Sequence, residues 1–116
     1  MSRRVLIADD SAVVRFFVAR RVRAEGLEVV ECESAAGASS VDVRDLSCAL
    51  LDVDLGDGFG TDVAETLRAL RRDLPIAFFT SSAAPEVLAR ARTFGPVFAK
   101  PEQLDQAMVW ITRHGR

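Results

Sequence analysis

The chain has 116 residues and a mass of 12.6 kDa, with 49% hydrophobic and 28% charged residues, which is typical of one soluble globular domain rather than of a disordered chain. A formal net charge of -2 and a pI near 5.4 argue against a protein that holds nucleic acid or an anionic membrane through a basic surface. No apolar run approaches the roughly 20 residues of a membrane-spanning helix. We therefore expect a single cytoplasmic domain over residues 1–116.

The chain begins with a charged pair and a short apolar run. Arg3, Arg4 and residues 5–8 resemble the start of a secretion signal. Asp9 and Asp10 end the apolar run too early for such a signal. Residues 5–8 are therefore predicted to form the first strand.

Short apolar runs alternate with longer amphipathic stretches along the rest of the chain, a pattern typical of strands joined by crossover helices. Further strands are predicted at residues 27–32, 49–53, 76–79 and 97–99. Helices are predicted at residues 11–25, 61–72, 85–94 and 102–114. Residues 34–45 are rich in serine, alanine and glycine and predict only a short or distorted helix. The alternation predicts an α/β fold, a doubly wound parallel sheet of five strands with helices on both faces.

The two cysteines and the single histidine indicate no metal or redox chemistry. Cys32 and Cys48 lack the spacing of a zinc site or a redox motif, and each falls in a predicted buried strand segment. His114 lies near the chain end without a second ligand at a metal-binding spacing. We predict two reduced, structural thiols and assign His114 no role.

Polar side chains stand at the ends of four predicted strands. In an open parallel sheet the carboxyl ends of the strands meet at one edge, where ligands bind. The residues at these ends are Asp9 and Asp10 for the first strand, Asp52 and Asp54 for the third, Thr80, Ser81 and Ser82 for the fourth, and Lys100 before Pro101 for the fifth. Carboxylates, hydroxyls and an ammonium are therefore expected to converge.

This set of groups favours phosphoryl transfer. Carboxylates gathered in a partly desolvated site repel one another, and a hard divalent cation with oxygen ligands, such as Mg²⁺, relieves that repulsion. A carboxylate oxygen can then attack phosphorus in line, while a hydroxyl and a lysine neutralise charge on the other phosphoryl oxygens. Lys100 suits this role because it is the only lysine among 15 basic residues, and lysine presents a compact point charge rather than a planar fork.

The order of these motifs resembles that of the receiver domains of bacterial two-component response regulators, over essentially the whole chain. The resemblance rests on the acidic pair Asp9 and Asp10, the segment LLDVDLGDGFG at residues 50–60, Thr80, and the pair Lys100-Pro101. It implies a flavodoxin-like receiver fold with the strand order 2-1-3-4-5.

The resemblance also implies a role for each matching residue. Asp52 would be the phosphoacceptor. The Asp10 and Asp52 side chains and the Asp54 backbone carbonyl would hold Mg²⁺, with Asp9 assisting through water. Thr80 and Lys100 would contact the phosphoryl oxygens.

The same resemblance implies the partners. A histidine kinase or a histidine phosphotransfer protein would supply the phosphoryl group. The phosphorylated chain would signal by non-covalent binding to a downstream protein that the sequence does not identify. It would be a self-phosphorylating and autodephosphorylating module rather than a turnover enzyme.

Simpler interpretations exist for the same residues. Asp9, Asp10 and Ser11 are common N-cap types for the first helix. Thr80 could be a loop residue before the next helix, and Lys100 could be an ordinary exposed lysine at a strand end. We favour function for Thr80 and Lys100 because the fold places them beside the acids.

A run of glycines follows the third strand. Gly56, Gly58 and Gly60 resemble a nucleotide-binding glycine loop, but such a loop follows a first strand, and Asp57 would lie where a phosphate has to approach. We interpret the segment as a flexible active-site loop.

Several positions depart from the family pattern. Receivers that switch through an aromatic side chain usually carry Tyr or Phe three residues before the lysine, where this chain has Val97, and the chain has no tyrosine. Phe98 is displaced by one residue, and it should face the other way because strand side chains alternate in direction. Gly56 and Glu102 replace the usual proline and apolar residue without touching the chemistry.

The Asp54 side chain is a further departure that bears on the chemistry. It is predicted to lie over the mouth of the site, where water would approach the acyl phosphate. A carboxylate there could orient the water or repel the phosphoryl group. We therefore expect Asp54 to change the lifetime of the phosphorylated state.

Apolar residues lie off the main stripes of the first and last helices. Val13, Phe16, Val109 and Trp110 are predicted to be partial core. In the receiver fold these helices are neighbours, so the same residues could instead form an exposed patch that binds a partner or a second copy as a homodimer.

Two other functions compete with a phosphoacceptor receiver. A pseudo-receiver would keep the fold and bind partners without phosphorylation, and Val97 favours it. A haloacid-dehalogenase-type phosphatase also carries an aspartate pair after a strand, as in Asp52 and Asp54. In that family the aspartate pair usually stands on the first strand and the second acidic pair comes last, which is the reverse of the order here.

Overall fold

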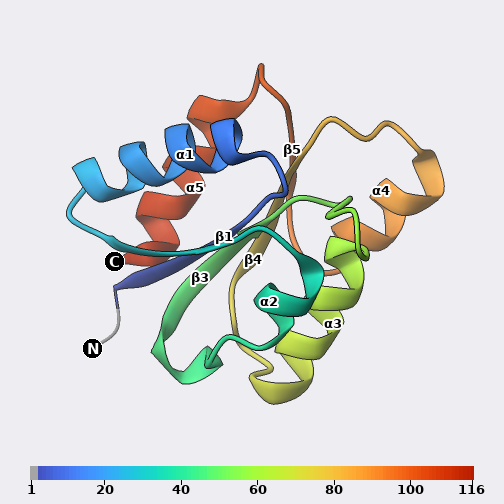
Figure 1. Cartoon of the computed structure of the whole chain (residues 1–116), viewed down its shortest axis with the longest axis horizontal. Coiled ribbons are helices and arrows are strands. Elements are labelled where there is room, and N and C mark those ends of the chain that lie inside the picture. Colours follow the sequence, from blue (N-terminus) through green and yellow to red (C-terminus); the bar gives the residue numbers. More distant parts are fainter. Residues whose placement is uncertain (1–2) are drawn as a thin grey trace.

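A computed structural model describes residues 3–116, so that residues 1 and 2 of the predicted domain lie outside the described part of the chain. At its centre is one sheet of five parallel strands in the order β2-β1-β3-β4-β5 (Figure 1). The strands are β1 (Arg4–Ala8), β2 (Glu28–Cys32), β3 (Leu46–Leu51), β4 (Ile76–Thr80) and β5 (Val97–Ala99). The predicted fold class and strand order are confirmed.

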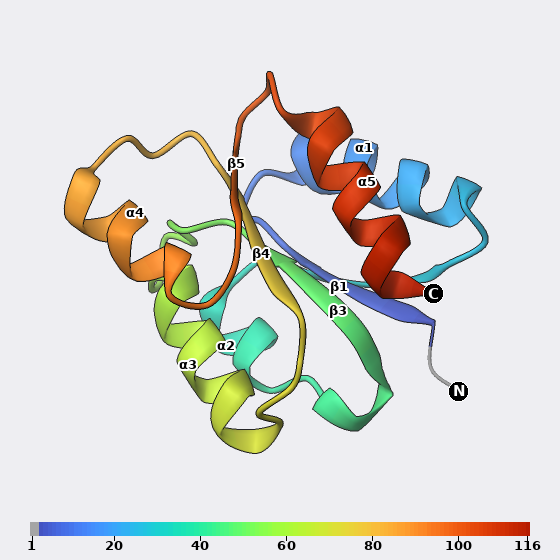
Figure 2. The same cartoon turned by 180° about the vertical axis from the view of Figure 1, so that it is seen from behind.

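Helices cover both faces of the sheet. The helices α1 and α5 lie on one face, and α2, α3 and α4 lie on the other (Figure 1, Figure 2). Their bounds are α1 (Ala12–Ala24), α2 (Ala35–Ser39), α3 (Gly60–Leu70), α4 (Pro85–Arg92) and α5 (Leu104–Gly115), and a short 3-10 helix, η1 (Val43–Asp45), precedes β3. Residues 34–45, whose sequence predicts only a short or distorted helix, thus contain a short helix. Within residues 3–116, no helix is long and apolar enough to cross a membrane.

The central strands are buried on both faces, which explains their continuous apolar runs. Successive side chains point to opposite faces and build two separate clusters. We call them the α3-side cluster, which includes Leu6, Leu51, Leu67 and Phe78, and the α1-side cluster, which includes Ile7, Val18, Leu50, Phe79 and Ile111.

The start of β3 differs from the prediction. The sequence predicts a strand from residue 49, whereas β3 begins at Leu46, which is buried and pairs with Arg4. Ser47 interrupts the apolar pattern, but its hydroxyl donates to the Arg4 carbonyl (3.0 Å), so the strand accommodates it. The strand ends before Asp52, although the Asp52 amide still donates to the Ala8 carbonyl (2.8 Å).

Two glycines allow close approaches between elements. A Cβ atom at Gly60, the first residue of α3, would lie 1.9 Å from the Asp52 carbonyl oxygen. A Cβ atom at Gly95 would lie 1.8 Å from the Ile76 carbonyl oxygen. Gly60 therefore lets α3 begin directly against the backbone of Asp52.

The apolar surface of α1 is larger than the sequence predicts. Val13 and Phe16, predicted to be partial core, are 65% and 58% exposed, and the adjacent Phe17 is 57% exposed. The buried stripe of α1 instead runs through Val18 and Val22. The prediction of partial core for Val13 and Phe16 is wrong, because this helix is apolar on more than one face and its periodicity does not single out the buried one.

The last helix follows the prediction more closely. Trp110 packs against the α1-side cluster, as predicted, and also stacks on His114 with 4.6 Å between ring centroids. Val109, also predicted to be partial core, is 57% exposed and belongs to the surface. It lies one residue away from the buried Met108 and two from the buried Ile111, outside the stripe they define.

The two cysteines are free, and both lie in strands. Cys48 is buried, and burial raises the pKa of its thiol to about 12. Burial also raises the pKa of the partly buried Cys32. Thiols that resist ionisation in this way are unreactive, which agrees with a structural role.

Candidate functional site

The carboxyl edge of the sheet brings together the polar residues predicted to meet there. Asp9 follows β1, Asp52 follows β3, Thr80 ends β4 and Lys100 follows β5. Asp9, Asp52 and Thr80 are 3%, 8% and 3% exposed, whereas Asp10 is exposed. Buried ionisable side chains need partners, and the two buried aspartates find theirs in Lys100.

Lys100 links two of the carboxylates. Its Nζ donates to Oδ2 of Asp9 (2.6 Å) and to Oδ2 of Asp52 (2.8 Å), and its amide donates to the Thr80 carbonyl oxygen (3.0 Å). Burial lowers the pKa of Lys100, but the hydrogen bonds and charges of Asp52 and Asp9 outweigh it and hold that pKa above its ordinary value. The side chain is only 14% exposed, so the interpretation of Lys100 as an ordinary exposed lysine is wrong.

Asp9 is held on three sides. Its Oδ1 accepts a hydrogen bond from the Ser11 amide (2.9 Å), and its Oδ2 accepts one from the Lys100 ammonium (2.6 Å). Its backbone carbonyl accepts a hydrogen bond from Nη1 of Arg15 (2.6 Å). Burial raises the pKa of Asp9 above its ordinary value, against the Lys100 and Ser11 hydrogen bonds, which lower it. The Ser11 hydroxyl also accepts the Val14 amide (3.3 Å), so Ser11 is the N-cap of α1.

Three carboxylates form a cluster suited to a divalent cation. Carboxylate oxygens of Asp9, Asp10 and Asp52 all lie within 4.8 Å of one another. Lys100 offsets one of the three negative charges, so that an excess of negative charge remains at this edge. Oxygen donors with excess negative charge fit Mg²⁺, which prefers carboxylate, carbonyl and water ligands.

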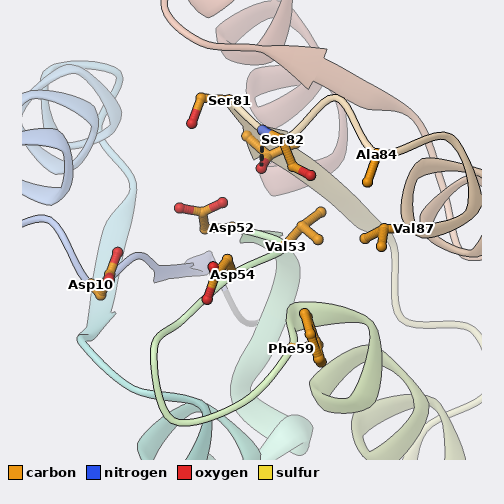
Figure 3. Close-up of a pocket in the computed structure, with 10 residues that line it drawn as sticks. Asp10, Asp52, Val53, Asp54, Phe59, Ser81, Ser82, Ala84 and Val87 are labelled. Atoms are coloured by element: carbon orange, nitrogen blue, oxygen red, sulfur yellow. Dashed lines mark hydrogen bonds between the residues drawn. The ribbon is translucent and has the colours of Figure 1, made fainter.

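A cavity of about 450 Å³ opens beside the carboxylates (Figure 3). It is lined by Asp10, Asp52, Val53, Asp54, Phe59, Thr80, Ser81, Ser82, Ala84 and Val87. The Thr80 hydroxyl accepts the Ser82 amide (3.2 Å), and Oδ1 of Asp54 accepts the Gly56 amide (3.0 Å). The volume of the cavity is in the range of small-ligand sites. Three of the four predicted acids and the three hydroxyls therefore share one cavity, while Lys100 links Asp52 to the fourth acid, Asp9.

The apolar wall of the cavity is not anticipated by the sequence motifs. Phe59 and Ala84 are the N-cap residues of α3 and α4, and Val87 lies in the first turn of α4. Helices that follow strands in a parallel sheet begin at the edge that binds ligands. The predicted helix starts were the signal that could have found these residues.

The loop of residues 54–60 lies beside the cavity, as predicted. Asp54 and Phe59 form an isolated antiparallel bridge, and the Leu55 amide donates to the Gly58 carbonyl (3.0 Å). Asp57 does not line the cavity and contacts the start of α2 instead. The loop is therefore a hydrogen-bonded turn with one side on the cavity and the other on α2.

The displaced aromatic side chain faces away from the usual switch position, as predicted. Val97 packs against the α3-side cluster, whereas Phe98 packs against the α1-side cluster. Phe98 pairs in the sheet with Phe79, which belongs to the α1-side cluster as well. Position 97 thus offers an aliphatic side chain where an aromatic one usually couples to the threonine.

Known proteins with similar sequences include bacterial regulatory proteins. The chain is 34% identical over 96 residues to the transcriptional regulatory protein PdtaR of Mycobacterium tuberculosis, covering 80% of this chain and 46% of that protein. It is 32% identical over 107 residues to the acid tolerance regulatory protein ActR of Sinorhizobium medicae, covering 90% of this chain and 55% of the relative. The chain spans about half the length of these curated relatives.

Solved structures share the fold. The non-phosphorylated HemR receiver domain from Leptospira biflexa has a TM-score of 0.85 and 23% identity, covering 97% of this chain and 93% of that one. A CheY-like response regulator receiver domain protein from Methanospirillum hungatei has a TM-score of 0.76 and 22% identity, covering 97% and 98%. The family model of the response regulator receiver domain matches residues 5–109. The chain therefore belongs to the response regulator receiver domain family.

Proposed function

We propose that Asp52 accepts a phosphoryl group from a histidine kinase or a histidine phosphotransfer protein, and that the phosphorylated chain signals in the cytoplasm by binding a downstream protein. The observation that carries the proposal is the placement of the Asp52 carboxylate. It lines the cavity, and its Oδ2 accepts the Lys100 ammonium at 2.8 Å. Membership of the receiver family supports the same role.

The transfer uses the two oxygens of Asp52 differently. Lys100 holds Oδ2, which leaves Oδ1 as the attacking oxygen. A bond forms between Oδ1 and phosphorus as the bond from phosphorus to the donor nitrogen breaks, and the nitrogen keeps the electron pair. Thr80 and Lys100 donate to the phosphoryl oxygens and stabilise their charge. Attack of water on the acyl phosphate later restores the Asp52 carboxylate and releases phosphate.

The site also has the donors for Mg²⁺. The Asp10 and Asp52 side chains and the Asp54 backbone carbonyl would hold the ion, with Asp9 acting through water. When bound, the cation supplies positive charge that lets an anionic phosphoryl group enter a site rich in carboxylates. Asp9 further orients the Lys100 ammonium through their 2.6 Å contact.

The exposed apolar face of α1 is the surface that we propose for the phosphodonor protein. Val13, Phe17, Lys100 and Pro101 line one hollow of about 180 Å³, so this face is continuous with the lysine of the site. Phe16 and Phe17 meet edge to face, with 5.9 Å between ring centroids. Apolar side chains gathered on a surface mark protein interaction sites. A second copy of this chain is the alternative occupant.

A pseudo-receiver is the second candidate function. Val97 favours it, because the usual aromatic readout of phosphorylation is displaced to Phe98 on the other face of the sheet. The joint presence of Asp52, Thr80 and Lys100 around one site argues against it.

Acetyl phosphate with Mg²⁺, followed by intact mass spectrometry, tests the proposal. We expect one added phosphoryl group on the wild-type chain, and none on Asp52→Asn or in excess EDTA. Asp73→Asn changes an exposed carboxylate and serves as the matched control, which should be labelled like the wild type.

An unlabelled wild-type chain, under conditions that label a control receiver, would overturn the phosphoacceptor function and favour the pseudo-receiver. Sustained turnover of a generic phosphomonoester would instead indicate a phosphatase.

A further inference from the structure

Asp57 joins the loop that carries Asp54 to the start of α2. Its Oδ1 accepts the Ala35 amide (2.7 Å), and its Oδ2 accepts the Ala36 amide (3.1 Å). These residues are 22 and 21 positions away along the chain. The two hydrogen bonds hold the pKa of Asp57 below its ordinary value. Both oxygens of one carboxylate thus bridge two segments that are distant in sequence.

The helix α2 depends on this contact because it is short. It has five residues, with Gly37 at its centre, and an isolated helix of this length is unstable. Every helix leaves its first four amides without partners of its own. Asp57 accepts two of them, and the Ser34 hydroxyl accepts a third, the Gly37 amide (3.0 Å). Asp57 therefore supplies two of the three side-chain acceptors at the start of this helix.

The loop also packs closely against α2 and is hydrogen-bonded within itself. A Cβ atom at Gly58 would lie 3.0 Å from Cβ of Ala35, so the two backbones are close. The Asp57 amide donates to the Leu55 carbonyl (3.0 Å), and the Leu55 amide donates to the Gly58 carbonyl (3.0 Å). These bonds connect Asp57 to Leu55, the residue after Asp54, and Asp54 is in turn bridged to Phe59, the N-cap residue of α3.

We propose that Asp57 is a positioning residue of the phosphoacceptor site: by fixing the loop to α2, it holds the Asp54 backbone and thereby sets the affinity of the site for Mg²⁺. The inference rests on the function proposed above, in which the Asp54 carbonyl is a ligand of the cation. Outer residues that orient metal ligands change metal affinity when they are removed. Asp57 does not line the cavity, so its effect passes through the loop.

Labelling by acetyl phosphate at increasing Mg²⁺ concentration tests the role of Asp57. In Asp57→Ala, the Mg²⁺ concentration that gives half the maximal rate should rise about tenfold. The rate at saturating Mg²⁺ should stay close to that of the wild type, because the reacting groups are unchanged. Asp57→Asn keeps one acceptor oxygen and should recover part of the affinity.

Two controls separate positioning from charge and from folding. Asp73→Ala removes the same charge from an exposed residue between α3 and β4, at the opposite edge of the sheet, and should leave the half-maximal concentration unchanged. Amide hydrogen exchange at Ala35 and Ala36 should accelerate in Asp57→Ala, which reports the loss of the contact directly. Circular dichroism and thermal unfolding establish that each variant is folded.

The outcomes distinguish the two proposals. An unchanged half-maximal concentration in a folded Asp57→Ala chain with accelerated exchange would overturn the positioning role. If the wild type is not labelled, the proposed function fails instead. Mg²⁺ titration followed by amide chemical shifts then still compares the affinities of wild type and Asp57→Ala, and equal affinities would overturn the positioning role as well.

Discussion

The Nζ atom of Lys100 lies 2.8 Å from Oδ2 of Asp52, although 48 residues separate the two along the chain. The contact joins the residue after β5 to the residue after β3, which are separated in the sheet by β4. A second carboxylate, Asp9, lies 2.6 Å from the same ammonium. The positive charge of Lys100 is thus placed between two carboxylates, where the proposed phosphoryl transfer would require it.

Lys100→Met should slow phosphorylation of Asp52 without abolishing the nucleophile. Removing a preorganised donor to a developing negative charge lowers rates by about 100-fold or more. Lys100→Arg keeps the charge but replaces a compact ammonium by a planar fork, so we expect only a partial recovery. Initial rates of labelling by acetyl phosphate, measured by intact mass on folded variants, check this. Labelling of Lys100→Met at the wild-type rate would remove Lys100 from the mechanism.

Asp9→Asn should stabilise the metal-free fold near neutral pH. Burial raises the pKa of Asp9 in the folded chain, so between its ordinary value near 3.8 and the raised value the folded chain binds more protons than the unfolded chain. Stability therefore falls as the pH rises through that window. Asparagine avoids the buried charge, and its single amide oxygen can still accept either the Ser11 amide or the Lys100 ammonium, although not both, while Lys100 keeps Asp52 as a partner.

We expect the free energy of unfolding of Asp9→Asn to exceed that of the wild type by about 1 kcal/mol near neutral pH, the scale of a typical substitution. The gain should shrink as the pH falls toward 3.8. Urea unfolding in EDTA across this range measures it. A less stable variant at neutral pH would mean that the ion pair with Lys100 outweighs the cost of burial.

Asp54→Asn should prolong the life of the acyl phosphate. The Asp54 side chain lines the cavity with one oxygen held by the Gly56 amide, which leaves the other oxygen to accept a hydrogen bond from water (Figure 3). The NH2 group of asparagine would donate a hydrogen bond to this water instead of accepting one from it. The rate of acyl phosphate hydrolysis should therefore fall about tenfold or more. The decay of phosphorylated protein after removal of acetyl phosphate measures the rate. An unaltered rate would show that Asp54 does not act on the water.

Gly60→Ala should disturb both stability and the site. The added Cβ atom would overlap the Asp52 carbonyl oxygen, 1.9 Å away, so the chain at the phosphoacceptor has to shift. Overpacking of this kind lowers the free energy of unfolding by about 1–3 kcal/mol or more. Gly95→Ala is the matched control, because its Cβ atom meets the Ile76 carbonyl at 1.8 Å instead. Both should lose stability in urea, but only Gly60→Ala should be labelled more slowly per folded molecule.

The strand order and the residues at the carboxyl edge could be predicted because they follow from local signals. Apolar runs identify the strands, and the edge rule then brings Asp9, Asp52, Thr80 and Lys100 together. The start of β3 could not be predicted, since Ser47 breaks the apolar run and its satisfaction by the Arg4 carbonyl is a tertiary contact.

The exposed face of α1 was only an alternative prediction, and the contacts of Asp57 could not be predicted, for a different reason. Phe16 and Phe17 are as apolar as core residues, and only the packing of Val18 and Val22 against the sheet determines which face is exposed. Asp57 looks like an ordinary loop acid, because its partners at the start of α2 are more than 20 residues away.

The sheet keeps the α1-side cluster and the α3-side cluster apart. This separation affects which substitutions the chain can accept during evolution. Substitutions in groups that share no contacts have nearly additive effects on stability. Substitutions beneath the surface of α3 and α4 should therefore disturb only slightly the packing of α1, which carries the surface proposed for the phosphodonor. The sheet thus lets the two faces of this small domain change largely independently during evolution.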